Sequence, residues 1–564
     1  MWRFLGRSPD RFSVPHFRFL ANELRRINYV DFQNREVVVD LMQSIVEIAT
    51  YGDKHDPAIF ECFMESQILP EFVRILKIRG SSSIEAPLLQ YMSIMIQNIE
   101  NEHAICYFLS NGYINSIIVH EFDFEGGDIV PYYVSFLRAV GGKLDGATVC
   151  LLVDVDKGTV VSFPLYEAAL NFVHYEEKMI QIAVRALILK IYKVADEMIF
   201  RFITSPPVAN YFAGLIKNIE NKCFRVEALT TGLEDNCSDK KREVLLETDR
   251  ILDDFYYLKD MISIPDHCLN KLIVENLVNL LVLPMLLSLL NARQSTDRTL
   301  SPITCLCMLC RLLQVLEGTN LVNVIGSAIL CFCMPRHISA DLQLKGAEIV
   351  RNNFLRHSSV YIDLRADEWL SCLPLENSEN ECRILGDNHS TMVATLLLLF
   401  IVADSKDLDP QLREVMGFSE VKTPAECNRS IFARQARKIV NQLLKVLASN
   451  PPGSVAMLFQ TAWFLRKLLV FLDQKLDDHD YLLFKTSWEL SCERLCGELN
   501  RCWFDCIPDR LKNEWDICTA VLEESSHSKD PFCFLELASA EVTPRGLTCQ
   551  LYPLMFLFLA CFLL

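Results

Sequence analysis

The feature that most constrains the fold is a helical pattern that recurs along the chain. In the segment 37–49, for example, apolar residues fall at positions 38, 41, 42, 45, 46 and 49. This three- and four-residue spacing gathers apolar side chains on one face of an α-helix. Alternating strand patterns are scarce, and the best candidate is a hairpin of 149–155 with 159–161, turning at 156–158. The sequence therefore predicts an all-α fold.

A longer period lies over the helical one. The segment 63–73 resembles 108–118 at an offset of 45 residues, and a third copy at 202–212 follows the first by 139 residues. Each copy predicts a helix, a short turn and a second helix. Helical units repeating at about 40 to 47 residues are typical of armadillo and HEAT arrays, in which neighbouring units bury each other's apolar faces. We predict an armadillo/HEAT-like α-solenoid with charged or irregular connectors; chance similarity between amphipathic helices is the alternative.

Breaks in the pattern divide the chain into six segments. A charged connector lies near 235–242, and an irregular stretch covers 351–390. The predicted segments are a basic, aromatic N-terminal segment (1–35), an armadillo-like domain (36–232), a second helical block (233–350), an irregular linker (351–390), a C-terminal helical region (391–546) and an apolar tail (547–564).

Charge and cysteine content exclude several classes of protein. The 564-residue chain carries a net charge of −17, which opposes extended contact with phosphate backbones, so we expect no nucleic-acid partner. The 22 cysteines are spread through apolar runs, as reduced, buried residues are. No uninterrupted apolar core of a signal peptide follows Met1. We expect a protein of the cytosol or of the cytosolic face of a membrane.

The N-terminal segment runs against the acidic balance. It interleaves aromatic residues with arginines, and its candidate membrane contacts are Trp2, Arg3, Phe4, Arg7 and Arg11. Anionic lipid head groups would attract such a segment. A packed cap on the solenoid is the alternative interpretation.

Two further stretches raise the question of membrane insertion. The last fourteen residues, 551–564, are largely apolar and would form a helix of about 21 Å, against a hydrocarbon core of about 30 Å. A tail anchor, a buried segment and a shortened or alternatively spliced chain all remain open for them. The stretch 272–290 is interrupted by Glu275, Asn276, Asn279 and Pro284, which favours a buried core helix.

Three clusters suggest ligand chemistry, and each has a structural alternative that we favour. Cysteines at 305, 307 and 310 with 331 and 333, and the pairs 492/496 and 502/506, have a density that zinc sites show; buried thiols are the alternative. The glycines of 141–146 flank Lys143 but lack a phosphate-loop spacing, which favours a loop between helices. His120, Asp123, Glu125 and Asp128 offer metal ligands in a stretch that indicates a solvated loop.

Several runs, in order, carry a resemblance to a known family. They are 111–120, Phe122-Asp123-Phe124, 132–137, 163–168, 182–185 and 191–194. The segment 37–219 resembles the FPL-domain family, that of the endosomal maturation defective (Ema) proteins and their plant relatives. The opening residues 1–8 resemble the plant branch, whose full-length members are longer. Within the family motif Phe163, Pro164, Leu165 and Tyr166, the proline predicts a helix start more than a binding site.

The resemblance implies a pathway that the residues alone do not supply. It implies a peripheral protein of Golgi or endosomes that supports membrane trafficking and protein transport to the vacuole or lysosome, vacuole development and autophagy, and in plants flavonoid accumulation. We predict a non-enzymatic scaffold that binds trafficking or tethering proteins and a membrane surface, without cofactor, metal or small-molecule substrate. An adaptor or component of a ubiquitin ligase is the alternative. A membrane-embedded transporter would need clear spans of about 20 apolar residues, which we do not find in the sequence.

Overall fold

The computed structural model describes residues 10–231 except 79, 126–127 and 195, then 238–290, 300–317, 321–326, 389–410, 412–413 and 440–446, with single positions at 461, 465, 481, 482 and 485. Contacts divide the chain into two compact units. Unit 1 comprises residues 1–218 and 253–276, and unit 2 comprises 219–252 and 277–564. The predicted apolar tail and all but the last two residues of the predicted linker lie outside the described residues.

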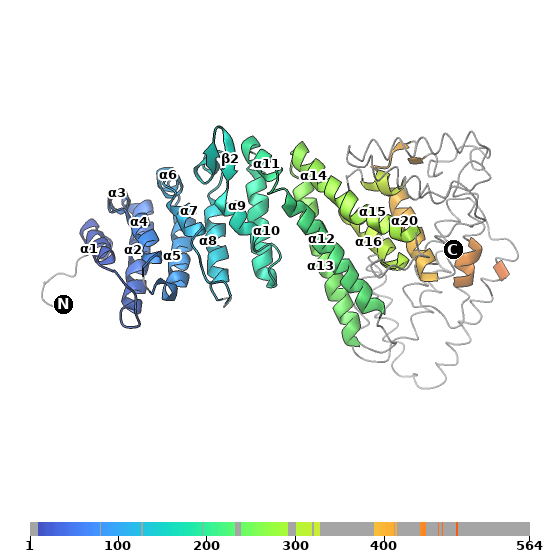
Figure 1. Ribbon diagram of the computed structural model, residues 1–564, viewed down its shortest axis with the longest axis horizontal. Coiled ribbons are helices and arrows are strands. Elements are labelled where there is room, and N and C mark those ends of the chain that lie inside the picture. Colours follow the sequence, from blue (N-terminus) through green and yellow to red (C-terminus); the bar gives the residue numbers. More distant parts are fainter. Residues whose placement is uncertain are drawn as a thin grey trace. The chain divides into compact units, whose positions relative to one another are not determined.

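Unit 1 is built of helices that follow one another in threes, two short and one long (Figure 1). They are α1 (Val14–Arg25), α2 (Arg35–His55), α3 (Pro57–Glu65), α4 (Ile68–Leu76), α5 (Glu85–Asn98), α6 (Glu102–Ser110), α7 (Tyr113–Ile118), α8 (Val130–Gly142), α9 (Pro164–Leu170), α10 (Lys178–Lys193) and α11 (Glu197–Ile203). Each long helix packs on the next, α2 on α5, α5 on α8 and α8 on α10. The predicted all-α repeat fold is confirmed. Each repeat contains three helices, whereas the sequence pattern showed two.

One polar residue starts each repeat. The side chains of four residues accept backbone N–H bonds from residues two or three positions later, in the manner of an N-cap: Asp56, Asn101, Asp145 and Asp196. Such a cap satisfies backbone donors that the first turn of a helix leaves without a partner. The caps at 56 and 101 are 45 residues apart, which is the offset between the first two copies in the sequence.

The turn between the two short helices also repeats. Gln67 precedes α4 with φ of 48°, and Gly112 precedes α7 with φ of 67°. These positions again differ by 45 residues. A positive φ suits glycine and is uncommon for a residue with a side chain. The two copies therefore form the same backbone turn with different residue types.

The third repeat replaces its first helix with a hairpin. Strand β1 (Asp154–Asp156) pairs antiparallel with β2 (Thr159–Ser162) through Lys157 and Gly158, both with positive φ. The predicted turn is confirmed, but the predicted start of the first strand at 149 is wrong. Residues Val149–Leu151 form a 3-10 turn, η2, because the capping interactions of Asp145 and Thr148 begin a helical turn there.

The core of unit 1 is aliphatic and aromatic. Phe63 of α3 lies against Phe108 of α6, with ring centroids 5.6 Å apart, and Phe17 of α1 packs on the other side of the same ring cluster at 6.2 Å from Phe63. The Leu187 side chain of α10 packs onto Gly141 of α8, where a Cβ atom would lie 2.1 Å from Leu187 Cδ1. A larger residue at that position would require the Leu187 side chain to shift.

Unit 2 begins in α12 (Asn210–Thr231) and α13 (Ser238–Ile262), each of which has residues in both units. Within unit 2, Glu247 of α13 accepts hydrogen bonds from Arg225 and Arg250. Helix α14 (His267–Leu277) belongs to unit 1 except for its last residue, and the chain continues in unit 2 as the π-helical η3 (Val278–Val282) and α15 (Leu283–Leu290). Helix α16 (Pro302–Val315) packs on α15 and on α20 (His389–Asp404).

Candidate functional site

The family motif lies inside the protein. Phe163, Leu165 and Tyr166 are fully buried, and Pro164 occupies the first turn of α9. Proline fits there because its missing N–H would have no partner inside the helix. The Glu167 carboxylate accepts the Phe163 N–H at 3.0 Å. These four side chains fix the start of α9, and a partner cannot reach the three that are fully buried.

Tyr166 belongs to a buried polar cluster in unit 1, which comprises Tyr166, Arg185, Tyr192, Tyr211, Asp254 and Tyr257. The hydroxyls of Tyr166 and Tyr192 are 2.7 Å apart, and those of Tyr211 and Tyr257 are 3.0 Å apart. Burial raises the pKa of Tyr166 and of Tyr257 above the usual range, so these phenols stay protonated and able to donate. The cluster connects α9, α10, α12 and α13.

A buried ion pair is the strongest link in this cluster. Arg185 donates to Asp254 Oδ1 at 2.5 Å, and the two side chains are only 8% and 1% exposed. The guanidinium also lies 4.8 Å from the centroid of the Tyr257 ring. Removing one partner of such a pair costs about 3–5 kcal/mol, because the other charge is left buried. In the sequence Arg185 belongs to one of the runs that carry the family resemblance, and its partner is 69 residues away.

The N-terminal segment is described only from residue 10, so Trp2, Arg3, Phe4 and Arg7 lie outside the described residues. Arg11 pairs with Glu47 of α2. Helix α1 packs on α2, α3 and α4, and its Phe17 is fully buried. Residues 14–25 therefore cover the first repeat, while residues 1–9 keep the membrane-contact prediction.

The glycine-containing stretch 141–146 ends a helix and turns. Gly141 and Gly142 are the last residues of α8, and Lys143 donates to the carbonyls of Gln97 and Ile99 at 3.1 and 2.6 Å. A cation placed at the end of a helix satisfies carbonyls that lack intrahelical partners. Lys143 is thus committed to the C-terminus of α5.

The acidic stretch after His120 separates its members. Asp123 accepts the Glu125 N–H at 3.0 Å and is exposed, as is Asp128. His120 points instead toward Glu85, with Nε2 at 3.6 Å from Oε1. Within the described part of the chain no group of three histidine, cysteine or acidic side chains could hold a metal ion.

The cysteines of α16 do not share one environment. Cys305 and Cys310 are buried, whereas Cys307 is exposed on another side of the helix. Burial raises the pKa of the Cys305 thiol to about 12, which favours the neutral thiol over the thiolate that zinc binds. Cys331 and Cys333, and the pairs at 492/496 and 502/506, lie outside the described residues.

One helical stretch in the described part of the chain is long and apolar enough to cross a membrane. It runs from His267 to Leu286, and half of it is buried within the protein. The sequence analysis found no such clear span because polar residues interrupt the run, yet the backbone continues helical through them. A buried core helix passes the same length and composition test, so this helix is weak support for a membrane span.

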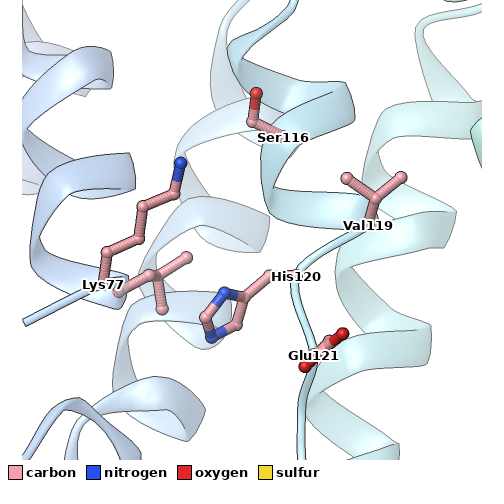
Figure 2. A pocket seen from close by; sticks show the side chains of 6 residues that line it. Lys77, Ser116, Val119, His120 and Glu121 are labelled. Atoms are coloured by element: carbon pink, nitrogen blue, oxygen red, sulfur yellow. The ribbon is translucent and has the colours of Figure 1, made fainter.

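A surface hollow of about 570 Å³ lies at the C-terminal ends of α4 and α7. Its lining residues are Leu76, Lys77, Ser116, Val119, His120 and Glu121. Figure 2 shows the Lys77 side chain extending toward the helix that carries Ser116, with the His120 ring below it and Glu121 directed away. Sequence analysis considered only His120, as a metal ligand, and missed the rest.

Comparison of the two repeat copies in the sequence gives an indication of this hollow. At the 45-residue offset, Lys77 corresponds to Phe122. Phe122 is buried, and its ring packs against the rings of Phe124 and Tyr133 at 6.1 and 5.3 Å. Extending the alignment of the two copies by four residues would have shown Lys77 opposite an aromatic residue, Phe122.

Comparison with known proteins identifies relatives for most of the chain. The model of the FPL family, described as an uncharacterised conserved protein, matches residues 42–192. Protein TRANSPARENT TESTA 9 of Arabidopsis thaliana is 30% identical, over 94% of this chain and 73% of that protein. The CLEC16A homolog of Drosophila melanogaster is 33% identical over 50% of this chain, and CLEC16A of Mus musculus is 32% identical over 56%. The matches span 26% and 31% of those two animal proteins.

Proposed function

The chain belongs to the FPL family together with TRANSPARENT TESTA 9, and we propose that it is a non-enzymatic scaffold that binds peripherally to the cytosolic face of Golgi or endosomal membranes. In this role it supports trafficking to the vacuole or lysosome, vacuole development and autophagy, and in plants flavonoid accumulation. The observation that carries the proposal is the similarity to TRANSPARENT TESTA 9 along 94% of the chain. Family membership supports the proposed pathway, and the helical-repeat fold supports the proposed role as a scaffold.

The repeat architecture supports a scaffold because it divides the side chains into two groups. The apolar faces of the helices and the family motif are used in packing one repeat on the next. The remaining side chains lie along an extended surface, which is how helical-repeat proteins bind their partners. Apolar residues occur on this surface too, among them Val119, Met179 and Ile182, which are 63%, 70% and 50% exposed. Trafficking or tethering proteins are the partners we propose for it.

Membrane fractionation tests the proposal. A peripheral scaffold sediments with Golgi or endosomal membranes and is released by high salt or carbonate, because polar contacts with lipid head groups and membrane proteins weaken under those conditions. A chain that stays with the membranes after carbonate treatment is inserted, and one that never sediments with them does not bind them; either result contradicts the proposal. Co-purification of ubiquitin-conjugating activity with the released chain would favour the ligase adaptor instead.

The same experiment locates the membrane contact. We propose that Trp2, Arg3, Phe4 and Arg7 touch the membrane, with Arg11 at the edge of this segment. Deleting residues 2–9 leaves α1 and its buried Phe17 in place, so the repeat keeps its first cover. The deleted chain should bind anionic liposomes less than the full chain does. Unchanged flotation with these liposomes would contradict a membrane role for the segment.

A further inference from the structure

The hollow beside α7 combines a lysine and a histidine at its wall. Lys77 follows the last residue of α4, its side chain is exposed, and no ion pair forms to it within the described part of the chain. The Ser116 hydroxyl already donates to the Gly112 carbonyl at 2.9 Å. Lys77 and His120 are therefore the groups of this hollow that are left to donate to a ligand.

The His120 ring is held in place from two sides. Its Nε2 faces Oε1 of Glu85, whose side chain is only 9% exposed, and its ring meets Phe122 edge to face at a centroid distance of 4.7 Å. These contacts leave the other ring nitrogen, Nδ1, without a hydrogen-bond partner among the described residues. A donor whose orientation is fixed before binding loses little conformational entropy when a ligand arrives.

The hollow also has an apolar wall. Val119 is 63% exposed although it follows the last turn of α7, and the lining also includes Leu76, which is buried. Glu121 is directed away from Lys77 and His120, so its carboxylate does not occupy the space between them (Figure 2). The wall offers a place for one aliphatic side chain next to the two donors.

The corresponding site one repeat later is closed. There Phe122, which aligns with Lys77 at the 45-residue offset, lies in the loop after α7, and the rings of Phe124, Tyr133 and Phe172 pack together with centroid distances of 5.1–5.7 Å. Packing therefore does not require a hollow at the end of a second helix. The lysine at 77 leaves open a space that an aromatic residue fills at 122.

We propose that this hollow binds a short acidic segment of a partner protein, with one carboxylate between Lys77 and His120 and a neighbouring aliphatic side chain against Val119. This inference rests on the proposed scaffold function and names the chemistry of one partner. A carboxylate suits the site because the Lys77 ammonium is a cation, and charge-assisted hydrogen bonds are the stronger ones. An aliphatic neighbour suits it because it removes the exposed face of Val119 from water.

Fluorescence anisotropy of the full chain with a labelled peptide of alternating glutamate and leucine tests the proposal. We expect saturable binding that weakens about tenfold in Lys77→Glu, since a hydrogen bond to a charged group is lost and repulsion replaces it. The matched control is Lys193→Glu, an exposed lysine in the last turn of α10, which should change the affinity less than twofold. Ser116→Ala should also leave binding nearly unchanged.

Two further peptides decide the ligand. A peptide with glutamine in place of glutamate should not bind, and equal affinity for it would overturn the role of the carboxylate. A peptide with phosphoserine in place of glutamate distinguishes the anion: exclusive binding of that peptide would show a phosphate site and overturn the proposal. Absence of saturable binding to the glutamate peptide would overturn it as well.

Fractionation of the Lys77→Glu chain separates this inference from the scaffold function. If the variant still sediments with endomembranes and is released by carbonate, the scaffold proposal stands whatever the peptide shows. Loss of membrane association by the wild-type chain would remove the scaffold proposal, while peptide binding measured in solution would still stand.

Discussion

Two positions of unit 1 that align at the 45-residue offset, Lys77 and Phe122, have different surroundings. At the α4–α7 junction, the second helix ends in Lys77 beside an open hollow. At the α7–α9 junction, the corresponding Phe122 closes the space with three further aromatic rings. The difference shows that repeat packing leaves some positions free to change, and a free position on an exposed surface is where a scaffold can acquire a partner.

The largest effect is expected from exchanging the residue types at positions 77 and 122. Phe122→Lys should lower the free energy of unfolding by about 3 kcal/mol or more, because it removes aromatic packing and buries an unpaired charge. The reciprocal change, Lys77→Phe, acts on an exposed side chain and should shift the free energy by no more than about 0.5 kcal/mol. Urea unfolding followed by fluorescence compares them. A similar loss of unfolding free energy in both variants would contradict the claim that Phe122 is needed for packing and Lys77 is not.

A smaller effect is expected from removing the N-cap of α6. Asn101 accepts hydrogen bonds from the backbone of His103 and Ala104 at the start of α6. Asn101→Ala should cost about 1 kcal/mol, the usual value of an N-cap. Asn101→Asp is the control, since it keeps an acceptor at the same place. A loss as large as that of Phe122→Lys would mean that the cap, rather than the ring packing, governs this part of the fold.

The smallest effect is expected from protonating the carboxyl of Asp145 at low pH. Backbone and side-chain hydrogen bonds from Thr148 lower the pKa of Asp145 below the usual range of an aspartate. A carboxyl whose pKa is lower in the folded state contributes stability above its unfolded pKa and loses it as the pH falls through the folded one. Because Asp145 lies at the surface, solvent screens this contribution. The protection of the η2 amides relative to their intrinsic exchange rate should therefore fall in the wild type as the pH drops below the usual carboxyl range, and not in Asp145→Asn.

The sequence predicted the parts of this fold that depend on local pattern. The 45-residue offset between 63–73 and 108–118 indicated the repeat, and the turn at 156–158 indicated the hairpin, because helical spacing and turn residues act within a few positions. The predicted start of β1 was wrong because the hydrogen bonds between Asp145 and Thr148, just before η2, are not visible in apolar spacing. The third helix of each repeat was not recognised from the sequence as part of the repeat.

The candidate site was harder to foresee, since its residues come from separate turns of the chain. Lys77 and His120 are brought together only when α4 and α7 pack, and the Arg185–Asp254 pair only when α10 meets α13. Neither pairing leaves a motif in the sequence. Of the predicted candidates, Phe163, Leu165 and Tyr166 lie in the core, while Trp2, Arg3, Phe4 and Arg7 stay predictions.

Proximity labelling in cells, with the labelling enzyme fused to the full chain, tests the central claim most directly. The account predicts that proteins of the cytosolic face of Golgi and endosomes are labelled above a freely diffusing control. It also predicts that Lys77→Glu loses some of these neighbours, while Lys193→Glu keeps them. A labelled set no richer in endomembrane proteins than that of the diffusing control would contradict the claim that this repeat protein is an endomembrane scaffold.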